Sequence, residues 1–139
     1  MTQTQTDATI TAQLVSEHER LGFMPRLFGR HYIWGEQLVY SWMRQLSSEY
    51  KGGYWDFYEL SNGGGYLAPR REGAFKMACA GNWFEGEVSA DAAGIIATLY
   101  ALNGLANRTE DDAIIERYYQ LANFAYEHAE NGKIAAAID

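Results

Sequence analysis

The chain has one cysteine, two prolines and no long apolar run, and each scarcity excludes a class of protein. Cys79 alone cannot form an internal disulfide, so packing has to hold the fold together. The longest nearly apolar stretch, residues 92–102, is about half of the roughly 20 residues that a membrane-spanning helix needs. No base precedes Arg20 and no apolar run opens the chain. A secretory signal is therefore not predicted, and a cytoplasmic protein without membrane contact is expected.

Basic residues are also scarce, because 11 lysines and arginines stand against 18 acids and leave a net charge of −7. The imbalance is confined to residues 81–139, which hold 10 acids and 3 bases, whereas residues 1–80 hold 8 of each. Neutralising a DNA backbone requires a basic face. Direct binding of nucleic acid is therefore not expected.

Aromatic residues, by contrast, are plentiful, with 4 Trp, 10 Tyr and 6 Phe in 139 residues. Together with an apolar fraction of 47%, this composition predicts one folded domain that comprises residues 1–139. Residues 1–7 are polar and have no periodicity, so we expect them to be disordered.

The spacing of apolar residues predicts the order of strands and helices. Alternation predicts a short strand or an extended arm at 9–15. Alternation and turn signals predict strands at 54–60, 66–69, 74–80 and 83–88, with an Asn-Gly hairpin turn at 61–65. Helical spacing predicts a helix over 30–46, preceded by a break at Met24-Pro25-Arg26. A second helix is capped by Ser89 or Asp91 and ends at Asn107-Arg108, a third opens at Thr109, and residues 133–139 continue helically. The expected fold is α+β, a small antiparallel meander of three to four strands with about three main α-helices.

No metal or phosphate motif meets its spacing requirement. His18, His31 and His128 are not at metal-ligand spacing, and Gly22 stands where a second zinc ligand would follow His18. Residues 63–65, Gly-Gly-Gly, lack the Lys-Ser/Thr of a phosphate loop and are better explained as a hairpin turn. We therefore predict no catalytic residue, metal or cofactor.

Five aromatic rings lie within residues 51–66, and the strand in this run allows two interpretations. Period two puts Tyr54, Asp56 and Tyr58 on one face, and Trp55, Phe57 and Glu59 on the other. Both faces can be buried between helices, because aromatic residues are favoured in strands. Alternatively, one ring is an exposed anchor for a partner, and Trp55 beside Asp56 is then the leading candidate.

Four blocks of the sequence are distinctive when taken together: Glu19–Arg26, Gly35–Met43, Gly52–Gly64 and Ser89–Ile95. Residues 14–127, which contain them, resemble the ArdB/KlcA antirestriction proteins. The resemblance implies a non-enzymatic α+β protein of plasmids, mobile elements or genomic islands. Such a protein protects incoming unmodified DNA from type I restriction endonucleases in the host cytoplasm. The partner implied is the type I restriction endonuclease complex or an associated host factor.

The matching blocks carry Arg20, Glu36 and Trp55 over as residues of an interaction surface, and none of them is assigned a catalytic role. Asp56 joins them because it places a charge beside the Trp55 ring. Two other roles stay open for the same residues. Glu36 and Asp56 could be the paired carboxylates of a small hydrolase. Arg20 could instead pair with Glu36 and fix the N-terminal arm on the helix.

Charge density separates DNA mimicry from other ways of blocking a DNA-cutting enzyme. A globule of this length has a diameter of about 37 Å from the size scaling, over which duplex DNA carries about 22 charges. The chain has 18 acids, diluted by 11 bases. Broad mimicry is therefore disfavoured, although the acidic C-terminal part could still act as a local mimic. Its densest run, residues 110–112, is also explained by the preference for acids at a helix start.

Overall fold

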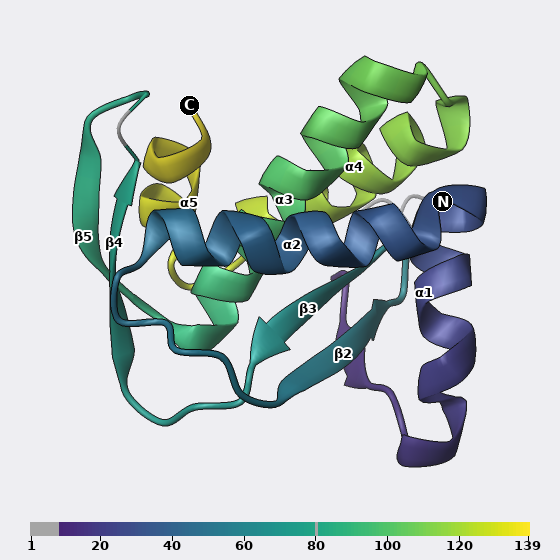
Figure 1. Cartoon of the computed structure of the whole chain (residues 1–139), viewed down its shortest axis with the longest axis horizontal. Coiled ribbons are helices and arrows are strands. Elements are labelled where there is room, and N and C mark those ends of the chain that lie inside the picture. Colours follow the sequence, from purple (N-terminus) through teal and green to yellow (C-terminus); the bar gives the residue numbers. More distant parts are fainter. Residues whose placement is uncertain (1–8, 80) are drawn as a thin grey trace, which may run out of the picture.

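The computed structural model describes residues 9–79 and 81–139, in which helices pack against two small antiparallel sheets (Figure 1). The elements are, in order, β1 (Ala12–Leu14), α1 (Arg20–Phe28), α2 (Tyr32–Leu46), β2 (Trp55–Leu60), β3 (Gly65–Pro69), β4 (Ala74–Cys79), β5 (Phe84–Ser89), α3 (Ala90–Thr109), α4 (Asp112–Tyr126) and α5 (Asn131–Ile138). Short 3-10 turns, Glu17–Glu19 and Gly29–His31, flank α1. The α+β class is confirmed. The expected disorder of residues 1–7 lies outside the described residues.

The predicted hairpin is confirmed and supplies β2, the middle strand, and β3, an edge strand, of the first sheet, whose strand order is β1-β2-β3. Gly63 has a φ of +97°, a conformation that glycine adopts without strain, and the Asn62 side chain accepts a hydrogen bond from the Gly64 N–H at 3.1 Å. The turn sets the register of the two strands, with Tyr58 opposite Tyr66 and their rings stacked at 4.9 Å.

The predicted single meander is divided into two sheets, because among the described strands β4 and β5 pair only with each other. The outer edge of β3 is occupied by α3. The buried Thr98 hydroxyl there lies 3.3 Å from the Leu67 N–H, which donates to it, and 3.5 Å from the Leu67 carbonyl oxygen. Because α3 contacts this edge and Thr98 satisfies the outward N–H and carbonyl of Leu67, these groups are not available to pair with a further strand.

Helix α1 corrects the break predicted at Met24-Pro25-Arg26, since the helix runs through Pro25. Proline removes one hydrogen bond to the residue four positions earlier, here Leu21, which is 94% exposed. The loss therefore falls on the solvent side of the helix. Four buried side chains on the other side hold the helix in place: Phe23, Met24, Leu27 and Phe28.

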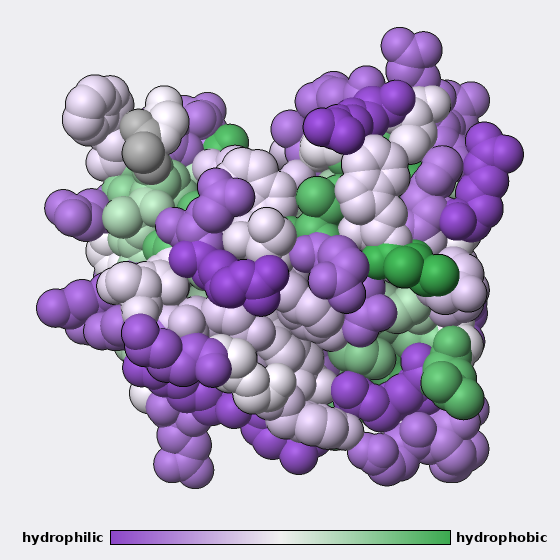
Figure 2. Space-filling view, in the orientation of Figure 1, coloured by the Kyte–Doolittle hydropathy of each residue, from purple (hydrophilic) through white to green (hydrophobic). Residues whose placement is uncertain are grey.

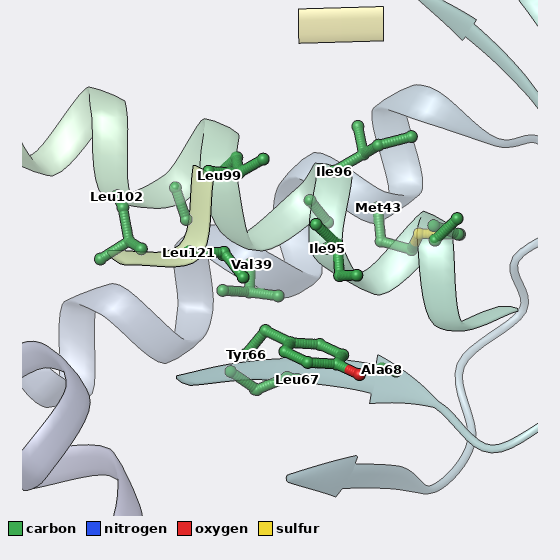
Figure 3. Packing of buried hydrophobic residues seen from close by; sticks show 14 of the residues in the cluster. Val39, Met43, Tyr66, Leu67, Ala68, Ile95, Ile96, Leu99, Leu102 and Leu121 are labelled. Atoms are coloured by element: carbon green, nitrogen blue, oxygen red, sulfur yellow. The ribbon is translucent and has the colours of Figure 1, made fainter. Parts of the chain in front are cut away.

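Helix α3 is the centre of the core, and it contacts α2, α4, α5, β3, β4 and β5. Twelve of its residues are buried, so it is apolar on all sides, as a helix enclosed by other elements should be. Figure 3 shows Ile95, Ile96 and Leu99 of α3 gathered with Val39 and Met43 of α2 above strand β3.

The helix caps are close to those predicted, with two shifts. The Ser89 hydroxyl accepts the Ala92 N–H at 3.0 Å and begins α3, as expected. Helix α3 passes through Asn107-Arg108 and ends at Thr109, so the predicted break was placed too early. The cap of α4 is Asp111, which accepts the Ala113 N–H, and not Thr109, which donates its hydroxyl to the Leu105 carbonyl.

Within the described ranges, no helix combines the length and the apolar character needed to cross a membrane.

Candidate interaction site

Arg20 begins α1 and lies against strand β2. One of its guanidinium nitrogens, Nη2, donates to the Trp55 carbonyl at 2.9 Å. The guanidinium carbon lies 3.9 Å from the centre of the Phe57 ring and 4.7 Å from that of Tyr54. A planar cation stacked on aromatic rings and bonded to a backbone carbonyl is held in one orientation. Arg20 is thus a partly exposed cation with a fixed direction.

Trp55 is buried, with 4% of its surface exposed, and the interpretation of this ring as an exposed anchor is therefore wrong. Its indole N–H donates to the Tyr50 hydroxyl at 2.9 Å, and the Tyr40 ring packs 5.1 Å away. The alternative interpretation, in which both faces of the aromatic strand are buried, holds for the face of Trp55 and Phe57. It fails for the other face, where Tyr54 is 43% exposed and Asp56 and Tyr58 are only half-buried. Trp55 can support a surface but cannot itself contact a partner.

Glu36 lies on α2 and is half-buried, and its carboxylate accepts a hydrogen bond from the Tyr40 hydroxyl at 2.8 Å. Burial and the Glu36 carboxylate both raise the pKa of the Tyr40 phenol, and the positive charge of Arg20 partly offsets this rise. Arg20 and Glu36 therefore lie in one neighbourhood, on either side of Tyr40. In the part of the chain that the structure describes, they form no salt bridge with each other, so the predicted ion pair is not present.

Asp56 points to the other face of β2 and binds Arg70, whose Nε lies 3.1 Å from one carboxylate oxygen. This pairing raises the pKa of the Arg70 guanidinium. The Arg70 guanidinium also lies 4.3 Å from the centre of the Tyr54 ring. Asp56 is thus linked to Arg20 indirectly, because Asp56 binds Arg70 and both arginines contact the Tyr54 ring.

Tyr54 joins the two halves of the site. Both Arg20 and Arg70 contact its ring, and its hydroxyl donates to the Glu17 carboxylate at 2.6 Å. The hydrogen bond to Glu17 raises the pKa of the Tyr54 phenol. We call the assembly the Arg20 cluster; it consists of Glu17, Arg20, Glu36, Tyr40, Tyr54, Asp56 and Arg70, with the buried Trp55 and Phe57 beside Arg20.

All four predicted residues thus belong to one neighbourhood, and sequence reasoning missed the groups that connect them. Arg70 was available from the hairpin register, because a ladder that pairs Trp55 with Pro69 places Tyr54 opposite Arg70. The Arg70 N–H indeed donates to the Tyr54 carbonyl at 2.8 Å. The contact of Tyr40 with Trp55 depends on how α2 crosses the sheet, and no local pattern encodes that crossing.

The two carboxylates suggested for a hydrolase are held by different partners, Glu36 by Tyr40 and Asp56 by Arg70. They lie on different elements, and no hydrogen bond joins them in the described ranges. Among the described residues, no group of three His, Cys, Asp or Glu side chains could hold a metal ion. The arrangement gives no support to the hydrolase alternative.

Comparison with known proteins identifies the family. The family model described as "Antirestriction protein" matches residues 48–139. The antirestriction protein KlcA of Escherichia coli is 49% identical over 146 aligned residues that cover 100% of both chains. This chain belongs to the antirestriction protein family.

Other members of the antirestriction family match almost as completely. The putative antirestriction protein YubI of Escherichia coli K12 is 38% identical, with 90% of this chain and 93% of that protein covered. A solved structure is 50% identical with a TM-score of 0.88 over 95% of this chain and 96% of that chain. That structure comes from a study of the KlcA and ArdB proteins. The two proteins show a novel fold, and they have antirestriction activity against type I DNA restriction systems in vivo but not in vitro.

Proposed function

We propose that this protein protects unmodified DNA entering a cell from type I restriction. It acts without chemistry of its own, by binding the restriction complex or a host factor associated with it. The observation that carries the proposal is the match to the solved KlcA/ArdB structure, at 50% identity and a TM-score of 0.88 over nearly the whole chain. At that similarity, the same elements are in place to present the same surface.

The activity of that relative in vivo but not in vitro bears on the mechanism. An inhibitor that simply occupies the DNA-binding site of the endonuclease would also act on the purified enzyme. Protection that requires the cell indicates a target or a step that the purified reaction lacks. We therefore favour a complex that forms in the cell, with the restriction complex or a host factor associated with it, over direct blocking of DNA cleavage by the purified enzyme.

The Arg20 cluster is the surface we propose for this contact. Arginine and tyrosine are over-represented among the residues that dominate protein interfaces. Arg20 and Arg70 are already held against Tyr54, so little side-chain entropy is lost when a partner binds. Trp55 contributes by supporting Arg20 through its carbonyl and Tyr40 through its ring.

The positions of the acids argue against a broad DNA mimic. In the acidic run at residues 110–112, Asp111 caps α4 and binds His31 at 3.1 Å. At the start of α3, Asp91 binds His128 and Glu130 binds Ser89. Asp91, Asp111 and Glu130 are thus engaged within the fold, which leaves fewer carboxylates to imitate the phosphates of a duplex.

The test is the plating efficiency of unmodified phage on a strain with a type I restriction system and on a matched strain without one. Wild-type protein should raise the efficiency only in the restricting strain. Arg20→Ala, Glu36→Gln and Asp56→Asn should each reduce protection at least about tenfold, as for loss of an interface hot spot. Purified endonuclease, assayed beside the cells, shows whether the cell is required.

Arg26→Ala is the matched control. Arg26 is an exposed arginine of the same helix α1, paired with Glu59 and outside the Arg20 cluster. Its removal should leave protection unchanged. Equal loss of protection in both arginine variants, or no protection by folded wild-type protein, would contradict the proposal.

A further inference from the structure

The turn between β4 and β5 presents a tryptophan to solvent. Trp83 is 91% exposed, although tryptophan normally buries a large apolar surface. Its φ is +64°, in the left-handed region that bulky L residues avoid. Figure 2 shows this end of the hairpin standing out at one corner of the molecule. Folding gains nothing from this side chain, since it combines a strained backbone with almost no burial.

The strain is maintained because the turn is fastened to the end of the chain. The Asn82 side chain donates to the Ala137 carbonyl at 2.6 Å and accepts the Phe84 N–H at 3.0 Å. The Asn82 N–H donates to the Cys79 carbonyl at 3.1 Å. These bonds fix the turn on α5, so Trp83 is directed outward before any partner arrives. Because the backbone of the turn is already ordered, a partner that binds there has only the side chain to order.

The exposed face of the hairpin is acidic near the turn, whereas its other end also carries Lys76 and contacts Lys133, whose Nζ donates to the Glu87 carbonyl at 2.7 Å. In the β4–β5 register, Glu85 lies opposite Ala78 and Glu87 lies opposite Lys76, and all four are exposed. Glu85, nearer to the turn, therefore has no cross-strand base. Asp139 is also close, because the Asn82 side chain lies 3.3 Å from its carbonyl oxygen. An aromatic ring bordered by carboxylates complements an apolar pocket with a basic rim.

We propose that the β4–β5 hairpin docks on a basic face of a DNA-handling subunit of the type I restriction system, with Trp83 in an apolar pocket. The inference rests on the proposed function and names the kind of surface involved. Proteins that move or cut DNA carry basic faces for the phosphates, and these faces are opposite in charge to the carboxylates of Glu85 and Glu87. A second copy of this chain is a poorer occupant, since it would bring acidic faces together.

The decisive variant is Trp83→Gly, because glycine removes the ring and also accepts the positive φ. The melting temperature should stay unchanged or rise by up to about 4 °C, while protection in the plating assay falls at least about tenfold. Trp83→Phe should keep most of the protection, and Glu85→Lys should reduce it. Tyr126→Ala is the matched control, as it removes another aromatic ring, 81% exposed, from the end of α4.

Photocrosslinking in cells identifies the occupant. A benzophenone amino acid at position 83, in cells with epitope-tagged restriction subunits, should form an adduct with a subunit, whereas the same group at position 126 should not. An adduct that also forms without the restriction genes, or one with the mass of a dimer, would overturn the inference. Full protection by Trp83→Gly would overturn it too and leave the proposed function standing. Failure of the wild type to protect would instead reject the proposed function itself.

Discussion

Replacement of Gly94 by alanine should destabilise the protein, although alanine is the better helix former. Gly94 lies in α3 where the helix crosses strand β3. A Cβ there would lie 2.2 Å from the Leu67 carbonyl oxygen and 2.5 Å from the Ala68 Cα. Both are backbone atoms of a strand paired on its other side, so they cannot move aside as a flexible side chain would. The helix would have to shift outward by about 1 Å to restore van der Waals contact.

The magnitude follows from two opposing terms. Glycine to alanine in a helix interior is worth about 1 kcal/mol in favour of alanine. Overpacking a tight core costs about 1–3 kcal/mol and sometimes more, and a clash with backbone belongs at the upper end. We expect Gly94→Ala to lower the free energy of unfolding by about 2 kcal/mol, or roughly 6–10 °C in melting temperature.

Gly104 provides the matched control within the same helix. A Cβ at Gly104 has no atom within 4 Å. Only the propensity gain remains there, and Gly104→Ala should stabilise the protein by about 0.5–1 kcal/mol. Urea denaturation followed by circular dichroism measures both changes. If both alanines shifted the unfolding midpoint in the same direction, the packing of α3 on β3 described here would be refuted.

Three further outcomes are expected. Asn62→Ala removes the bond to the Gln120 carbonyl that ties the hairpin turn to α4, and should cost about 1–3 kcal/mol in urea denaturation. Burial alone would raise the pKa of the Glu130 carboxyl, but hydrogen bonds from Ser89 lower it overall. Because the folded pKa lies below the unfolded value of 4.5, this stabilisation is present above that pH and lost as the pH falls below it. Glu130→Gln should therefore flatten the acid side of a melting-temperature profile. Arg20→Lys should abolish protection against restriction, because lysine lacks the planar group that stacks on Phe57. The same change should lower the free energy of unfolding by less than about 1 kcal/mol.

Local sequence signals predicted the elements wherever the local and tertiary preferences agree. Three signals depend only on residues that are near one another in the sequence: the Asn62-Gly63 turn, the cap at Ser89 and the spacing of apolar residues in α2. Pro25 is the instructive failure, because proline is unfavourable in a helix by its own chemistry. The burial of Phe23 and three neighbours outweighs this cost. That gain exists only once α2 and the sheet are in place.

The candidate site shows the same division. Arg20, Glu36, Trp55 and Asp56 could be named from the sequence, and they do share one neighbourhood. Their exposure could not be predicted, since an amphipathic strand does not reveal whether its second face is covered. Trp55 became buried because α2 places Tyr40 over it. Trp83 gave no signal in the sequence, because neither its positive φ nor its exposure follows from its neighbours in the chain.

The α+β class, the hairpin, the main helices and the membership of the antirestriction family all follow from the amino-acid sequence. These properties depend on the periodicity of apolar residues, on turn residues and on short distinctive blocks of sequence, which can all be read along the chain. The tertiary structure alone decided that β4 and β5 form a separate sheet, that Trp55 is internal, and that Trp83 is external. Each of these depends on contacts between residues far apart in the chain. Thr98 on β3, Tyr40 on Trp55 and Asn82 on Ala137 are such contacts, and their energies arise only when the elements pack.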